Sequence, residues 1–420
     1  MTDPFERYRT DTLILLVGGN PLPNYVAAHL LAHPASQIVL IHSEGTHERA
    51  KLLEQVLRCE GRTATALAHV NEADPASIFQ QVQAVAQQHP SGSIGLNYTG
   101  GTKAMSVHAY RALEQARPQA IFSYLDARRL SMVIDRTDCL PIEQRVAVSL
   151  DTLLELHGLG SKKQQMKRET PAPALPTTRA ALLKVHTDKQ QHKDWRKWCQ
   201  QHLRCQDGRH KSDGDLNKLT IDDVTVPDVQ AALAQLQAWG WACTVADVTV
   251  PDIKAALQHD APGVPLLKDI LKRKGSGIAK WLEGDWFEEY VFGCVQACIA
   301  DRAACDLAMT INPTIGSTDF EFDIGFMYGH QFFGISVTTD HTKSLCKSKL
   351  LEAVVRTEQL GGAEARCALV CCANAEIVDK LKDEVQGLPN ETLIRVFGAQ
   401  QIDQLAVHLD QWITEASQGA

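Results

Sequence analysis

Asn97-Tyr98-Thr99-Gly100-Gly101-Thr102-Lys103-Ala104-Met105 is the stretch that decides the fold. It closes an apolar run that predicts a short buried strand, and it opens a segment with helical spacing up to Leu113. A Gly-Gly turn at a helix N-terminus offers unpaired backbone N–H groups and the positive end of the helix dipole, and Lys103 adds a charge. The stretch therefore predicts an anion-binding turn. An ordinary glycine turn between a strand and its crossover helix fits the local spacing equally well.

Strand and helix patterns alternate on both sides of this turn. Strands are predicted at Thr12 to Val17, Gln37 to His42, Thr63 to Val70, Ser93 to Tyr98 and Ala120 to Leu125, with Ser131 to Asp135 as a hairpin partner. Predicted helices separate the first five, at Tyr25 to Ala32, Thr46 to Leu57, Pro75 to His89 and Thr102 to Gln115. This alternation predicts a parallel, doubly wound, Rossmann-like sheet.

Ligands of such sheets bind beyond the carboxyl ends of the strands, and three loops are expected at that edge. The candidate ligand-binding residues there are Gly18, Gly19, Asn20, Ser43, Thr99, Gly100, Gly101, Thr102 and Lys103. Neither the Walker A spacing nor the G-x-G-x-x-G fingerprint is present. The motifs thus give no support to nucleotide hydrolysis or to nicotinamide or flavin chemistry.

Length and composition indicate a soluble protein of several domains. The chain has 420 residues, 44% hydrophobic and 22% charged, and no apolar run approaches the roughly 18 residues of a membrane span. The N-terminus has no apolar signal segment, so we expect a cytoplasmic protein. The net charge of -8 means that any nucleic-acid binding must use a local basic surface.

Composition shifts divide the chain into four parts. We expect a Rossmann-like domain at 1–155, a linker at 156–177, a mainly helical middle region at 178–275 and a C-terminal domain at 276–420. In the middle region, Trp195 and Trp198 alternate with Lys193, Arg196 and Lys197. This pattern fits a nucleic-acid surface, but we favour a solvated helix with buried tryptophans. A near-repeat at 220–233 and 244–257 suggests no chemistry.

The C-terminal part contains paired carboxylates. Apolar residues alternate from Phe320 to Phe326, so Glu321 and Asp323 are expected on the other face of one strand, with Phe332 to Thr339 as its antiparallel partner. A helix that starts near Gly284 could bring Glu288 alongside. Three carboxylates suit Mg²⁺ or Mn²⁺, which can activate water and stabilise a phosphodiester transition state. A strand whose carboxylates merely face solvent is the alternative.

Two sets of motifs resemble known families. Leu15-Leu-Val-Gly-Gly-Asn-Pro-Leu-Pro-Asn24 and Asn97 to Met105 resemble the CRISPR-associated Rossmann fold (CARF) sensor domain. Trp286-Phe-Glu288, Glu321-Phe-Asp323 and the helix ending in Gln359-Leu-Gly-Gly362 resemble the PD-(D/E)xK restriction-endonuclease fold of CARF-fused nucleases in type III CRISPR systems. The resemblance implies cyclic oligoadenylate, commonly cyclic tetra-adenylate, bound across a homodimer, and cleavage of DNA, RNA or both with Mg²⁺ or Mn²⁺.

One departure concerns the second catalytic strand. That strand usually carries E-x-K, whereas here it reads Ile335-Ser336-Val337-Thr338-Thr339. Either Lys343, Lys347 or Lys349 supplies the lysine, with Glu288 or Glu289 as the replacement acid, or the domain no longer cuts. The leading hypothesis is a metal-dependent antiviral nuclease activated by the cyclic ligand. A CARF-controlled nucleic-acid-binding regulator is the alternative, and the sensor domain could also cleave its own ligand.

Overall fold

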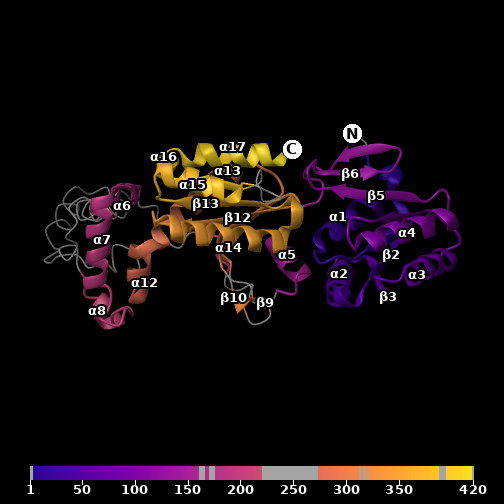
Figure 1. Cartoon of the computed structure of the whole chain (residues 1–420), viewed down its shortest axis with the longest axis horizontal. Helices are drawn as coiled ribbons and strands as arrows, with labels where there is room; N and C mark the ends of the chain where they lie inside the picture. Colours follow the sequence, from indigo (N-terminus) through magenta and orange to yellow (C-terminus); the bar gives the residue numbers. More distant parts are fainter. Residues whose placement is uncertain are drawn as a thin grey trace, which may run out of the picture.

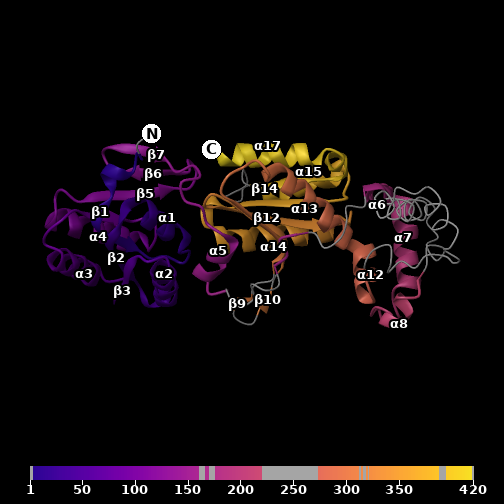
Figure 2. The ribbon, with the colours of Figure 1, turned by 180° about the vertical axis from the view of Figure 1, so that it is seen from behind.

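The computed structural model describes residues 3–159, 166–169, 176–219, 273–311, 314–315, 318–319, 321–386 and 394–418. It is an α/β protein with two large sheets (Figure 1). The N-terminal sheet lies at one end of the molecule, the C-terminal sheet lies in the centre, and the helices of the middle region lie at the other end. The view from behind in Figure 2 gives the same order.

The N-terminal sheet has seven strands in the order β3-β2-β1-β4-β5-β6-β7. They are β1 (Thr10–Leu16), β2 (Ala32–His42), β3 (Thr63–His69), β4 (Ile94–Asn97), β5 (Ile121–Asp126), β6 (Ser131–Ile134) and β7 (Asp138–Pro141). The first five are parallel, and β6 and β7 are antiparallel. The predicted doubly wound sheet is confirmed. Chain order reverses between β1 and β4, so the loops after these two strands are neighbours.

Helices cover both faces of this sheet because its strands are apolar on both faces. The helical elements are η1 (Glu6–Tyr8), α1 (Leu22–Leu31), η2 (Glu44–Thr46), α2 (His47–Cys59), α3 (Pro75–Gln88) and α4 (Lys103–Ala116). Along β1, Leu13 and Leu15 pack with α1 and α2, while Ile14 and Leu16 pack with α3 and α4. Successive side chains of a strand point to opposite faces, which accounts for this division.

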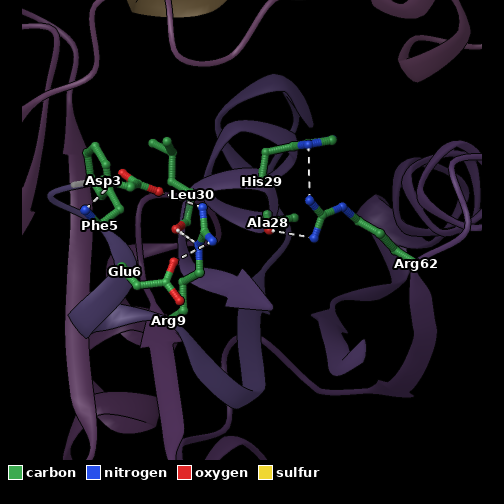
Figure 3. A network of polar contacts seen from close by, with 8 residues as sticks. All are labelled: Asp3, Phe5, Glu6, Arg9, Ala28, His29, Leu30 and Arg62. Carbon is green, nitrogen blue, oxygen red and sulfur yellow. Dashed lines mark hydrogen bonds and ion pairs between the residues drawn. The ribbon is translucent and has the colours of Figure 1, made fainter. Parts of the chain in front are cut away.

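Two arginines cap the carbonyl end of α1 (Figure 3). Arg9 donates to the Leu30 carbonyl and Arg62 to the Ala28 carbonyl. Arg9 also pairs with Asp3 and Glu6, both at 2.7 Å. The last carbonyls of a helix have no partner within the helix, so these contacts fix the point where α1 ends and β2 begins.

The C-terminal sheet has five strands in the order β14-β13-β12-β11-β8. They are β8 (Cys305–Ile311), β11 (Phe322–Tyr328), β12 (Gln331–Thr338), β13 (Arg366–Cys371) and β14 (Ile394–Phe397), and a separate hairpin is formed by β9 (Thr314–Ile315) and β10 (Thr318–Asp319). The strands β8, β11 and β12 are antiparallel, and β12, β13 and β14 are parallel. The predicted pairing of β12 with β11 is confirmed.

Both faces of this second sheet are also covered. Its helices are α13 (Trp286–Ile299), α14 (Lys343–Gly361), η6 (Gly362–Glu364), α15 (Ala375–Val385), α16 (Ala399–Ile402) and α17 (Leu405–Ser417). On β12 and β13, Ile335 and Val370 pack with α13 and α17, while Leu369 packs with α14 and α15. Figure 1 shows α17 and α14 on opposite sides of β12. The alternative interpretation is that Glu321 and Asp323 merely face solvent. This is wrong for Asp323, which is buried.

The middle region is helical where it is described. Its elements are α6 (Pro176–Thr187), α7 (Lys189–His202), α8 (Asp213–Leu216), α12 (Ser276–Lys280) and the π-helical turn η5 (Trp281–Asp285). Trp195 and Trp198 are buried in the hydrophobic cluster that also contains the α13 face of the C-terminal sheet. The prediction of buried tryptophans is confirmed. The near-repeat lies outside the described residues. Of the helices that the structure describes, none is long and apolar enough to cross a membrane.

The helix α5 (Leu150–Leu156) joins the two sheet domains. Leu153 and Leu156 share one hydrophobic cluster with α2 and with Phe332 and Leu360 of the C-terminal part. Backbone N–H groups at its start bond to that part as well, with Leu150 N donating to Asp306 Oδ2 at 2.8 Å. The N-terminal domain and the C-terminal sheet therefore have a continuous core.

Candidate functional sites

The loops after β1 and β4 touch at the edge of the N-terminal sheet, and only glycine fits between them. A Cβ on Gly18 would lie 3.0 Å from Gly101 N, and a Cβ on Gly100 would overlap the Leu16 carbonyl oxygen. Gly101 has a φ of 75°, which favours glycine for a second reason. Gly18 therefore lies against the loop after β4, as predicted. Gly19 is exposed, and a Cβ added to it would have no atom within 4 Å.

The other loop residues divide into exposed and internally bonded side chains. Thr102 and Lys103 are exposed, and Thr102 caps α4 through a hydrogen bond from Met105 N to its Oγ1 at 3.2 Å. Thr99 Oγ1 donates to Asn97 Oδ1 and accepts from Leu125 N, so this hydroxyl fixes the loop. Ser43 is buried in a capping box with Thr46. The sequence predicted that Thr99 and Ser43 contact a ligand. In the structure the hydroxyls of both residues make hydrogen bonds within the protein.

Two asparagines of the β1–α1 segment have buried polar atoms without a hydrogen-bond partner among the described residues. Asn24 donates from Nδ2 to the Leu16 carbonyl at 2.9 Å, while its Oδ1 faces Gly100 and is unsatisfied. Asn20 accepts from Leu22 N, and its Nδ2 is unsatisfied. Asn24 was not among the predicted site residues, although it ends the quoted Leu15 to Asn24 motif. Unsatisfied buried groups are costly, so a ligand or water that bonds them would be stabilised.

Asn20 also lies at the contact between the two domains. A Cβ on Gly362, at the end of α14, would overlap Asn20 Nδ2. Nearby, the imidazole of His157 bonds the Leu360 carbonyl at 2.9 Å, and Arg49 donates to the His157 carbonyl at 2.7 Å. The candidate ligand loop therefore abuts the C-terminal end of α14.

In the C-terminal domain, Asp323 is the centre of the candidate catalytic site. The β11–β12 ladder ends at the Ile324–Ile335 pair, and beyond it Asp323 Oδ2 accepts hydrogen bonds from Val337 N at 2.6 Å and Ser336 Oγ at 3.0 Å. Burial raises the pKa of this carboxyl, and these hydrogen bonds together with the Lys349 ammonium oppose that shift. The carboxylate is thus held rigidly on the face of the sheet that α14 covers.

Glu288 and Glu321 lie in the field of Asp323. Burial and the neighbouring charges of Asp323, Asp285 and Glu321 raise the pKa of Glu288 to about 8. Partial burial and Asp323 also raise the pKa of Glu321, which precedes β11 and is exposed. Glu288, at the start of α13, is thus near enough to Asp323 and Glu321 for their charges to affect it. A shared metal site for the three acids stays a prediction.

The chemistry of this carboxyl set suits a hard cation, because the positive charge of Lys349 only partly offsets the raised pKa values of these oxygen donors. Within the described ranges, however, no group of three or more His, Cys, Asp or Glu side chains is arranged closely enough to hold a metal ion. Glu289, the alternative ligand, is buried and bonds Trp281 Nε1 and Arg273. It is therefore committed to the core of the domain.

Of the three candidate lysines, Lys349 lies closest to the acids. Its Nζ is 3.8 Å from Asp323 Oδ2 and 3.5 Å from the Val337 carbonyl. Lys343 and Lys347 instead pair with Glu384 of α15 at 2.8 and 2.6 Å. The sequence could not choose among them because the choice depends on the rotation of α14 about its axis.

These features define a class of protein: a Rossmann-like domain with a glycine-rich edge, joined to a second α/β domain with buried carboxyl groups beside a lysine. Residues 12–150 match the family model described as the Card1 CARF domain. The N-terminal domain is therefore a CARF domain.

Solved structures share the fold over the whole chain. Can2 from Sulfobacillus thermosulfidooxidans, solved with cyclic tetra-adenylate, is similar with a TM-score of 0.62 and 16% identity, over 98% of this chain and 99% of that one. Protein VC1899 from Vibrio cholerae is similar with a TM-score of 0.59 and 13% identity, over 97% of this chain and 99% of that one. No curated protein matches this sequence.

Proposed function

We propose that this protein is a nuclease of type III CRISPR defence that is activated by a cyclic oligoadenylate and depends on Mg²⁺ or Mn²⁺. The observation that carries the proposal is the junction of a CARF domain with a buried Asp323 held between Ser336, Val337 N and Lys349. Without the acids and the lysine of the C-terminal domain, ligand binding to the CARF domain would have no catalytic site to regulate.

The sensor part of the proposal places the ligand over the glycine loops. The ring phosphates would lie at the N-terminus of α4 beside Thr102 and Lys103, where backbone N–H groups and the helix dipole favour anions. The exposed Gly19 and the unsatisfied Asn24 Oδ1 would contact the bases or sugars. The fold likeness to Can2, which was solved with cyclic tetra-adenylate, supports this ring size.

The ligand's symmetry supports a homodimer. A two-fold axis presents the same loop twice, so a ring of repeated nucleotides can make identical contacts to both protomers. We propose that the residues Thr99 to Lys103 of both protomers face each other across this axis.

The catalytic part assigns roles to the C-terminal residues. Glu288 and Asp323 would hold the metal ion, with Glu321 beside them, and the bound ion would supply a Lewis acid and an activated water. Ser336 Oγ and Val337 N keep the Asp323 carboxylate oriented. The Lys349 ammonium adds positive charge where the phosphodiester gains negative charge in the transition state.

A direct test incubates the full-length protein with supercoiled DNA or single-stranded RNA, Mn²⁺, and cyclic tetra-adenylate or cyclic hexa-adenylate. We expect cleavage only with a cyclic ligand, and at least a roughly 100-fold loss of rate in Asp323→Asn. Absence of ligand-dependent cleavage of both substrates would contradict the nuclease assignment.

The replacement of E-x-K by Ser336-Val337-Thr338 favours a second candidate, a CARF-controlled nucleic-acid-binding regulator. This candidate predicts that the cyclic ligand changes nucleic-acid affinity while Asp323→Asn leaves that affinity unchanged. Chromatography of the cyclic ligand after incubation with the protein tests a further activity. Conversion of the ring to a linear product would show that the sensor domain cleaves its own ligand.

A further inference from the structure

The helix α7 has two chemically different faces. Trp195, Trp198 and Cys199 are buried in the core, and the two tryptophan rings stack at 4.9 Å. The opposite face is exposed and carries the basic and amide side chains of Lys193, Arg196, Lys197, Gln200 and Gln201, together with one carboxylate, Asp194, which accepts hydrogen bonds from Gln190. The residues 193, 197 and 200 or 201 lie on one side of a helix because they are three or four positions apart.

This polar face lines a cavity of about 630 Å³, to which His192 and His341 also contribute. Among the described residues, the side chains that line this cavity include three cations and no carboxylate. A concave surface of this composition suits a polyanion, because the lysine, arginine and amide groups all donate hydrogen bonds.

A second cavity, of about 480 Å³, lies between α7 and the end of β12, the strand that also carries Ser336. It shares His192, Arg196 and Gln200 with the first and extends to Thr338, Thr339 and Asp340 at the end of β12. Thr338 lies two residues beyond Ser336, whose hydroxyl bonds Asp323. Two of the residues that line this second cavity are acids: Asp340 lies 3.8 Å from Arg196 and offsets part of its charge, and Glu283 pairs with Arg204 at 2.6 Å. A strand lying along α7 would therefore lead toward Asp323.

We propose that the exposed face of α7 binds the sugar-phosphate backbone of the nucleic-acid strand that the C-terminal domain acts on. This inference rests on the proposed function, since it names how the substrate reaches that site. Binding is independent of base sequence, because the aromatic rings of α7 are buried and cannot stack on bases. The eight residues from Lys193 to Gln200 span about 10 Å along the helix axis, which corresponds to roughly three phosphates of one strand.

Phosphodiester chemistry is common to DNA and RNA, so the test uses both. Fluorescence anisotropy measures the binding of labelled single-stranded DNA and RNA to the full-length protein in EDTA, without activator. In the double variant Lys193→Gln/Lys197→Gln we expect affinity to fall about tenfold, and the slope of log affinity against log salt to decrease by about 1.4. Lys193→Arg/Lys197→Arg keeps both charges and should bind like the unchanged protein.

A matched control removes two exposed lysines elsewhere. Lys380→Gln/Lys382→Gln on α15 changes the net charge equally and should leave the affinity unchanged. Thermal unfolding confirms that each variant is folded. Equal loss of affinity in both double variants, or no loss in the α7 variant, overturns the inference. Loss confined to the α7 variant supports it.

The same variants separate this inference from the nuclease assignment. If ligand-dependent cleavage occurs, Lys193→Gln/Lys197→Gln should raise KM about tenfold with little change in kcat. A protein that never cleaves but loses strand affinity in the α7 variant would contradict the nuclease and support the α7 site. A protein that cleaves, but whose KM is unchanged in this variant, would support the nuclease assignment and contradict the α7 site.

Discussion

Lys349 and Lys347 lie two residues apart on α14 and reach different partners. Lys349 approaches Asp323, whereas Lys347 pairs with Glu384. We therefore expect Lys349→Met to lower ligand-dependent cleavage at least about 100-fold, since it removes the charge beside the reacting phosphate.

The neighbouring lysine provides a control for this prediction. Lys347→Met removes the same charge from the same helix and should change the cleavage rate by no more than about threefold, because surface ion pairs contribute little. Single-turnover cleavage with saturating activator measures both. Equal losses in the two variants would mean that α14 charge, and not the position of Lys349, supports catalysis.

Gly100 and Gly19 differ in the space around them. An added methyl group at Gly100 meets the Leu16 carbonyl, and at Gly19 it meets nothing within 4 Å. Gly100→Ala should therefore destabilise the protein by about 1–3 kcal/mol, and Gly19→Ala should change stability by less than about 0.5 kcal/mol. Denaturant unfolding of both variants without ligand tests this; equal stability would contradict the packing of the two loops.

At the scale of elements, the strands and helices of the first domain were predictable because each strand is a continuous apolar run between turn residues. The environment of Asp323 was not. Alternation from Phe320 to Phe326 indicates two faces of a strand, but whether the second face meets solvent depends on α14, which is distant in sequence. Likewise, a serine or threonine at a strand end can contact a ligand or cap a turn, and Ser43 and Thr99 do the latter.

The helix α5 makes stability depend on pH through His157. Burial, and to a lesser degree Arg49, lowers the pKa of this imidazole to about 4 from an ordinary value near 6.5. Between these values the unfolded chain takes up a proton that the folded protein does not, so stability is complete above about pH 6.5 and falls as the pH approaches 4.

Replacement of this residue tests the assignment. His157→Gln keeps a donor for the Leu360 carbonyl. It should reduce the slope of unfolding free energy against pH, between about pH 6 and 4.5, by up to about 1.4 kcal/mol per pH unit. Urea unfolding at several pH values measures the slope. An unchanged slope would show that His157 does not cause the dependence.

At the scale of the whole molecule, the continuous core through α5 predicts that the two sheet domains unfold together. All seven tryptophans lie at or beyond Trp195, so their emission reports only the middle and C-terminal parts. Cyclic tetra-adenylate at 100 times its Kd stabilises the state that binds it by about 2.7 kcal/mol. We therefore expect the tryptophan-detected Tm to rise by at least about 2 °C, although the ligand binds the other domain.

Linear adenosine monophosphate serves as the control and should leave this Tm unchanged. Two separate thermal transitions, with the tryptophan-detected one insensitive to the cyclic ligand, would contradict a shared core.

The helix α14 has one further consequence, which is mechanical. Lys349 lies in its first half, Gly361 ends it twelve residues or about 18 Å further along, and the next residue, Gly362, lies against Asn20. A hydrogen-bonded helix moves as a stiff rod, so a displacement imposed at the Asn20 end reaches Lys349 as a shift or a rotation about the helix axis. With Lys349 Nζ only 3.8 Å from Asp323 Oδ2, a movement of an ångström or so is enough to make or break that ion pair.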